Sequence, residues 1–124
     1  MPARRGPISG NISLMDAKKK IALILDDIEQ ELRQLGLWGG SGARPHYSAF
    51  ESEIPFFLDT MDFHQWLEYV LIHNLRQMIA SDERLPETML IHTVAEELYK
   101  DNLELYKNLI DHLFRLDSHF NEFD

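Results

Sequence analysis

The side chains of this chain that could hold a metal are six histidines and many carboxylates. A metal site on a helix needs ligands three or four residues apart, as in a Glu-x-x-His pattern. No Glu-x-x-His occurs and no two histidines have that spacing, since they are His46, His64, His73, His92, His112 and His119. The sequence therefore predicts no metal site and no other cofactor.

Residues for covalent catalysis are also missing. Ser41 lies between Gly40 and Gly42, but the strand-turn-helix context of a serine nucleophile is absent. The chain has no cysteine, which excludes thiol catalysis and cysteine-bound metals. We therefore predict no catalytic residue and favour a non-catalytic protein, while the sequence leaves open whether any activity exists.

One segment concentrates large side chains where a loop passes into a helix. It runs from Pro55 to Met61 and is followed closely by further aromatic residues. One interpretation is a groove rimmed by aromatics that binds a peptide or a small ligand. The candidate binding residues are Phe56, Phe57, Asp59, Trp66, Tyr69 and His73. In this interpretation Asp59 and His73 supply the polar contacts.

The alternative interpretation of the same segment is structural. Phe56 and Phe57 would fasten the loop to the core, since aromatic stripes at helical spacing are usually part of the core. Asp59 and Thr60 would satisfy the free amides at the helix start. The sequence does not decide between these two roles.

Helical periodicity defines the elements that would position this segment. Apolar residues recur every three or four positions over 14–35, and Gly36 is a natural helix terminator. A second helix with its own apolar stripe is expected to start at Thr60 or Asp62, and Asp62 with Gln65 resembles a capping box. Leu85 and Pro86 are expected to open a third helix, and Asp101 to cap a last one whose apolar face is Leu105, Leu109, Leu113 (or Ile110), Leu116 and Phe120.

These elements predict an all-α fold, an antiparallel four-helix bundle with a long aromatic-rich loop between helices 1 and 2. Within that loop we expect residues 39–42, which are rich in glycine, to be the loosest part. Residues 13–124 form the single expected domain. Residues 1–12 contain prolines and glycines and are expected to be a flexible basic extension.

Charge separates the two ends of the chain. The formal net charge is −9. Residues 1–20 carry a net +4 and residues 21–124 a net −13. An acidic domain does not favour direct nucleic-acid binding, which depends on Lys and Arg. No apolar run approaches the roughly 20 residues that span a bilayer, so we expect no membrane partner. Together with the absence of cysteine, this suits a cytoplasmic protein.

Several motifs together resemble the YqcC-like family of small bacterial proteins. They are Pro55-Phe56-Phe57-Leu58-Asp59-Thr60-Met61, then Trp66-Leu67, Val70-Leu71-Ile72 and Leu85-Pro86, within a resemblance that covers roughly residues 14–120. The resemblance implies an all-helical bundle of uncharacterised function, associated by name with tRNA pseudouridine synthase C. It transfers no catalytic residue to this chain.

Three functional hypotheses follow. The first is a non-catalytic accessory protein that binds an unidentified protein partner, with a tRNA-modifying enzyme as one option. The second is direct participation in tRNA pseudouridylation, as the family label implies. The third is a small-ligand site near Trp66. Homo-oligomerisation is compatible with all three.

Overall fold

The computed structural model is built from helices. It describes the backbone of residues 2–86 and 88–121, and the side chains of residues 16–86 and 88–120. The α-helices are α1 (Pro2–Gln34), α2 (Phe63–Trp66), α3 (His73–Ala80), α4 (His92–Leu98) and α5 (Leu103–Asn121). A π-helical segment (Leu67–Ile72) joins α2 to α3, and 3-10 turns lie at Ser41–Ala43, Tyr47–Glu51, Pro55–Phe57 and Lys100–Asn102. Within these residues there is no strand, which confirms the all-α prediction.

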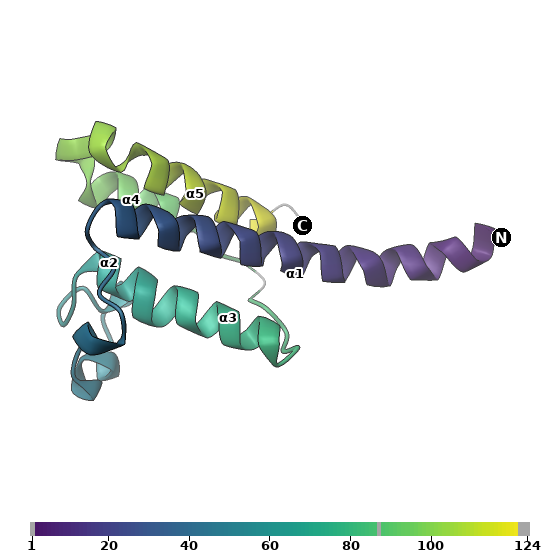
Figure 1. Ribbon diagram of the computed structural model, residues 1–124, viewed down its shortest axis with the longest axis horizontal. Coiled ribbons are helices and arrows are strands. Elements are labelled where there is room, and N and C mark those ends of the chain that lie inside the picture. Colours follow the sequence, from purple (N-terminus) through teal and green to yellow (C-terminus); the bar gives the residue numbers. More distant parts are fainter. Residues whose placement is uncertain (1, 87, 122–124) are drawn as a thin grey trace.

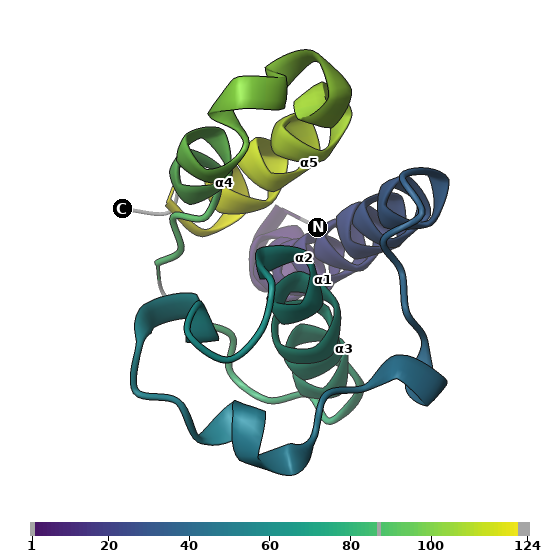
Figure 2. The same cartoon turned by 90° about the vertical axis from the view of Figure 1, so that its left-hand side faces the viewer.

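Helix α1 lies between the other helices. It packs along α5 and also against α3, while α4 packs on α5. Figure 1 shows α1 running between α5 and α3, and Figure 2 shows α4 and α5 on one side of it with α2 and α3 on the other. The residues that connect α1 to α2 pass around the outside of α3 (Figure 2). The antiparallel four-helix bundle remains a prediction.

The two ends of α1 differ in how well they were predicted. The C-terminal end is confirmed: Gly36 has a φ of 75°, and the Leu37 amide donates to the Leu32 carbonyl at 2.8 Å. This is the hydrogen-bond pattern of a Schellman terminus. At the other end the helix begins at Pro2 and not at residue 14. Proline is tolerated in a first helical turn because its missing amide has no helical partner there. The proposed domain boundary at residue 13 falls inside this helix.

The core forms where the apolar stripes of the helices meet. Three groups of side chains are buried in it. They are Ile21, Ile24, Ile28 and Leu32 of α1, then Phe63, Leu67, Leu71 and Leu75 of residues 63–80 (α2, the π-helical segment and α3), and Leu109, Leu113, Leu116 and Phe120 of α5. These positions confirm the predicted stripes. Leu105 is wrong as a core residue, since it is 58% exposed. It lies in the first turn of α5, where its side chain faces solvent.

The start of the third helix was predicted too early, because a long-range contact sets it. Residues 85–86 and 88–91 are not helical, and α4 begins at His92. Asp117 on α5 is 2% exposed, and its Oδ2 accepts hydrogen bonds from the amides of Ile91 and His92, both at 2.8 Å. The His92 ring Nδ1 lies 2.7 Å from the same oxygen. Asp117 therefore caps α4 from a neighbouring helix.

No helix within the described residues combines the length and the apolar character that crossing a bilayer requires.

The cap made by Asp117 predicts a large effect on stability. Asp117→Ala would leave the buried amide of Ile91 and the partly buried amide of His92 without this acceptor, and each such loss costs about 1–3 kcal/mol. We expect the free energy of unfolding in urea to fall by roughly 2–4 kcal/mol. The control is Asp111→Ala, an exposed carboxylate on the same helix. Equal stability of the two variants would contradict the capping role.

Tyr99 predicts how stability depends on alkaline pH. Burial, assisted by Tyr106 and Asp62, raises the pKa of Tyr99 to about 12. In the unfolded chain a tyrosine ionises near pH 10, so the unfolded state loses this proton first as pH rises. The stabilising contribution is therefore complete below about pH 10 and is lost between about pH 10 and 12.

Urea titrations across this pH range test the effect. We expect Tyr99→Phe to flatten the fall in unfolding free energy, while Tyr47→Phe, at a tyrosine that is 74% exposed, leaves it unchanged. An unaltered slope in the Tyr99 variant would show that its phenol does not drive the pH dependence.

Candidate functional site

Helices α2 and α3 and the π-helical segment between them form one continuous run over residues 63–80, which we call the second helical stretch. The π-helical segment of residues 67–72 is its irregular element. The sequence pattern predicts one regular helix here, but α2 and α3 are joined by a wider turn. As a result Leu67, Glu68 and Tyr69 are all buried, although they are consecutive in the chain. Single π-helical turns are rare and are frequently found at functional sites.

Glu68 fastens the glycine-rich loop to this segment. Its side chain is buried, and its two carboxylate oxygens accept hydrogen bonds from the amides of Gly39 at 2.8 Å and Gly40 at 2.7 Å. Hydrogen bonds to an ionised acceptor are stronger than neutral ones and offset the desolvation of the carboxylate. Glu68 thus joins the stretch after α1 to the middle of the second helical stretch.

Tyr69 completes this attachment. Its hydroxyl donates to the Gly40 carbonyl at 2.5 Å. Burial, and then the neighbouring Glu68 carboxylate, raise the pKa of Tyr69, so the phenol stays protonated and able to donate at neutral pH. The prediction that residues 39–42 are the loosest part of the loop is therefore wrong at its first two residues, because Glu68 and Tyr69 hold them.

Backbone conformation at Gly40 and close packing at Gly39 explain why glycine occupies these two positions. Gly40 has a φ of 75°, a conformation that residues with a Cβ rarely adopt. A Cβ at Gly39 would lie 2.6 Å from the Tyr69 hydroxyl and 2.9 Å from the Ala43 Cβ. The loop can approach Tyr69 this closely only without a side chain at Gly39.

Beside this attachment lies a surface hollow, which we call the Tyr69 hollow. Its volume is about 610 Å³, and the residues that matter for its chemistry are Arg33, Trp38, Arg44, Tyr69, His73 and Arg76. Volumes of this size are typical of ligand pockets. The hollow combines aromatic walls with cationic side chains.

Two of the arginines at the hollow are held in place by acidic partners. Arg76 contacts Glu29 at 2.7 Å and Asp26 at 2.9 Å, and Arg33 contacts Glu29 at 2.8 Å. Although burial alone raises it, the pKa of Glu29 is lowered overall because Arg76 and Arg33 donate hydrogen bonds to its carboxylate. The guanidinium of Arg33 also lies 5.2 Å from the centre of the Trp38 ring. These contacts fix one wall of the hollow.

The third arginine faces aromatic rings. The guanidinium carbon of Arg44 lies 4.6 Å from the ring centre of Phe50 and 5.8 Å from that of Tyr69. Such cation–π contacts attract a guanidinium to the face of an aromatic ring. Arg44 is also exposed, so it is accessible to a binding partner.

The predicted binding residues are divided among three places. Tyr69 and His73 line the Tyr69 hollow. Phe56 and Trp66 pack together in an aromatic cluster, with ring centres 4.8 Å apart and Phe63 close to both. Phe57 contacts Phe50 edge-on, at 6.5 Å between ring centres. The structure thus does not bring all six candidates together, and their binding role remains a prediction.

Asp59 has a structural partner other than the expected one. Its carboxylate accepts a hydrogen bond from the Ser52 hydroxyl at 2.5 Å, within the loop. The helix start is satisfied instead by Gln65, whose side chain accepts from the Asp62 amide at 2.8 Å, as the predicted capping box requires. The structural role assigned to Asp59 at the helix start is therefore corrected.

Backbone strain marks the predicted aromatic segment. Phe56 and Phe57 have φ values of 59° and 51°, in the left-handed region that bulky residues rarely occupy. The aromatic contacts of both rings offset this cost. The strain directs Phe56 toward Trp66, so the segment fastens the loop to the core.

Sequence reasoning missed Trp38, Arg44 and Glu68 as residues of the site. Glu68 had a detectable signal, since it is a carboxylate between the apolar Leu67 and the aromatic Tyr69 in a buried stripe. Trp38 directly precedes two glycines, which is the pattern of a tightly packed turn. In the described part of the chain, no group of three potential metal ligands comes together.

Comparison with known proteins places the chain in a family. A family model described as tRNA pseudouridine synthase C matches residues 20–119. The chain therefore belongs to this family, which includes the uncharacterised protein YqcC of Escherichia coli. That relative is 33% identical over 72 residues, which are 58% of this chain and 64% of YqcC.

Two further relatives differ in what their names say about function. An uncharacterised protein of Haemophilus influenzae is 34% identical over 85 residues, which are 68% of this chain and 78% of that protein. A protein of Pectobacterium carotovorum named tRNA pseudouridine synthase C is 29% identical over 86 residues. That match covers 69% of this chain but 22% of the Pectobacterium protein. No solved structure matches the chain.

The close packing at Gly39 yields a stability prediction. We expect Gly39→Ala to lower the free energy of unfolding by about 1–3 kcal/mol, because the new methyl group would push Tyr69 away from Gly40. The matched control is Gly42→Ala, where a Cβ meets nothing within 4 Å. Urea unfolding followed by tryptophan fluorescence measures both. If the two variants were equally stable, the loop would not depend on this approach.

Proposed function

We propose that this protein is a non-catalytic accessory protein that binds a tRNA-modifying enzyme through the Tyr69 hollow. The observation that carries the proposal is the Pectobacterium match, which covers 69% of this chain but 22% of a protein named tRNA pseudouridine synthase C. Most of that longer protein lies outside the match. Two units that share one chain in one organism are natural binding partners when they occur separately.

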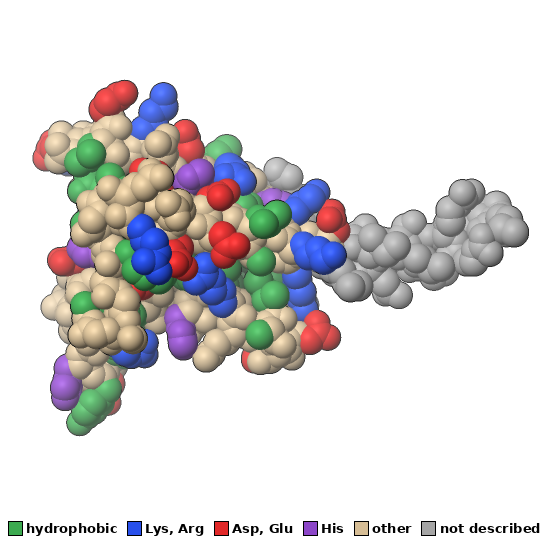
Figure 3. All heavy atoms as spheres, viewed as in Figure 1, with side chains coloured by type: hydrophobic (Ala, Val, Ile, Leu, Met, Phe, Trp, Pro, Cys, Tyr) green, Lys and Arg blue, Asp and Glu red, His purple; other side chains and the backbone are tan. Residues whose placement is uncertain are grey.

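The distribution of charge supports a protein partner over direct contact with tRNA. Residues 21–124 carry a net charge of −13. On the face shown in Figure 3, acidic and basic side chains are interspersed, and no broad basic surface is visible. RNA backbones bind to clustered Lys and Arg. A partially neutralised hollow with aromatic walls suits a protein segment better.

A small ligand is the second candidate, and one observation favours it. The Tyr69 hollow has a volume of about 610 Å³, within the range of small-molecule sites. The expected location near Trp66 is less suitable, because Phe56 covers that ring at 4.8 Å. A small ligand would thus contact Tyr69 and His73.

Titration calorimetry with a tRNA pseudouridine synthase from the same organism tests the proposed function. We expect binding that is weakened at least tenfold by the double variant His73→Ala/Gln77→Ala, whose exposed residues both line the hollow. The control is Asn74→Ala, an exposed neighbour outside the hollow.

Parallel titrations with tRNA and with the synthase define the opposing outcomes. Absence of binding to the synthase would overturn the proposal. Binding of tRNA alone, with affinity that falls steeply with salt, would favour direct participation in tRNA modification.

A further inference from the structure

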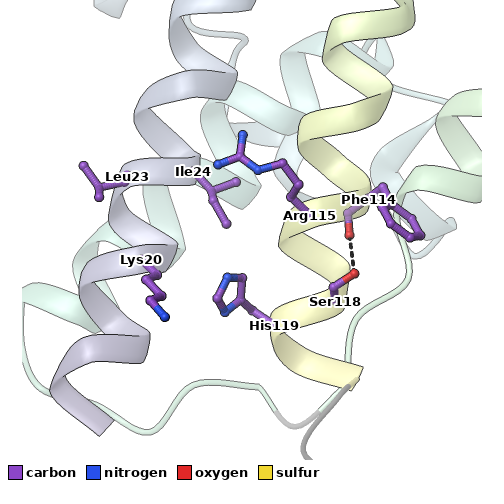
Figure 4. Close-up of a pocket in the computed structure, with 7 residues that line it drawn as sticks. All are labelled: Lys20, Leu23, Ile24, Phe114, Arg115, Ser118 and His119. Atoms are coloured by element: carbon purple, nitrogen blue, oxygen red, sulfur yellow. Dashed lines mark hydrogen bonds between the residues drawn. The ribbon is translucent and has the colours of Figure 1, made fainter. Parts of the chain in front are cut away.

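A second hollow lies between α1 and α5, and we call it the α1–α5 hollow. Its volume is about 320 Å³, and it shares no lining residue with the Tyr69 hollow. In Figure 4, Lys20 of α1 and His119 of α5 point toward each other across it, with Arg115 above and Ile24 on the inner side. Two helices therefore direct three basic side chains into one space.

The acidic partners of these bases hold them only weakly. Lys20 pairs with Asp16 at 3.2 Å, and Arg115 pairs with Asp27 at 3.3 Å. All four side chains are about half exposed. Ion pairs with such exposure contribute little to stability, so a carboxylate from another molecule can replace Asp16 or Asp27 at small cost. The site is available to an anion.

Two other polar groups around the hollow are already engaged in hydrogen bonds. The His112 ring nitrogen Nδ1 lies 2.9 Å from the Arg115 guanidinium. The hydroxyl of Ser118 donates to the carbonyl of Phe114 at 3.0 Å (Figure 4). Lys20, Arg115 and His119 are therefore the groups of this hollow that an added carboxylate would meet.

Large apolar side chains flank the basic groups. Leu23 is 62% exposed and Phe114 is 54% exposed. Both residues line the hollow, and Figure 4 shows Leu23 on the outer side of α1 and Phe114 on the far side of α5. A free phosphate or an RNA backbone would leave both residues in water. A protein segment can cover them and also offer a carboxylate between them.

We propose that the α1–α5 hollow is a docking site for an acidic segment of a partner protein. A carboxylate of the segment contacts Lys20, Arg115 and His119, and apolar side chains on either side of that carboxylate cover Leu23 and Phe114. Charge complementarity to an acidic sequence selects this occupant. The site uses none of the residues of the Tyr69 hollow, so it stands independently of the proposed function.

Peptide display with a randomised library on the intact protein tests the docking site. We expect the enriched peptides to carry Asp or Glu next to Leu or Phe, and their affinity to fall with added salt. Enriched peptides without acidic residues would overturn the proposal.

Variants then locate the binding surface. We expect Lys20→Gln/Arg115→Gln to weaken binding of the enriched peptides at least tenfold. The control Lys100→Gln/Lys107→Gln removes the same charge from exposed sites elsewhere and should leave the affinity unchanged. Phe114→Ser should also weaken binding, in contrast to Leu105→Ser, an equally exposed residue of the same helix. Equal affinities for a variant and its control would contradict the site.

Two further measurements separate the other occupants. If a 12-nucleotide oligouridylate displaced the enriched peptides, the site would bind RNA, and this would overturn the proposal. Sedimentation that reveals a dimer, broken by Leu23→Ser, would show that a second copy covers this surface, and would also overturn it. We expect a monomer and no displacement.

Discussion

The carboxylate of Glu68 is the contact on which the Tyr69 hollow depends. It accepts from the amides of Gly39 and Gly40, while Tyr69 donates to the Gly40 carbonyl. A buried carboxylate without such donors would cost several kcal/mol. The π-helical segment makes the arrangement possible, because it buries Glu68 and Tyr69 together although they are adjacent in sequence. In the described part of the chain, these are the hydrogen bonds that hold Gly39 and Gly40 over residues 63–80.

The two hollows illustrate how one acidic domain can present different chemistry on different surfaces. In the Tyr69 hollow, Arg33 and Arg76 are held by Glu29, and aromatic rings form the walls. In the α1–α5 hollow, Lys20 and Arg115 have exposed, weak acidic partners. A net charge averages over such differences, because it counts charges without regard to their partners or their burial. The local environment therefore says more about binding than the total of −9 does.

Much of the fold could be predicted because it depends on local patterns. The spacing of Ile21, Ile24, Ile28 and Leu32 places them on one face of α1, and all four are buried. Gly36 ends this helix with a positive φ, as its sequence position indicates. The candidate site was predictable only in part: Tyr69 and His73 line the hollow, whereas Phe56 and Trp66 pack against each other elsewhere. Aromatic residues that are close in sequence can face different sides of a helix.

The sequence alone determined the helical class, the apolar faces and the acidic character of the domain, since each follows from residue types and short-range spacing. Only the tertiary structure decided where α4 begins, which glycines are held and which cations share a hollow. Asp117 reaches Ile91 across 26 residues, and Glu68 reaches Gly39 across 29. Contacts over such separations leave no periodic signal, because they exist only after the helices have packed.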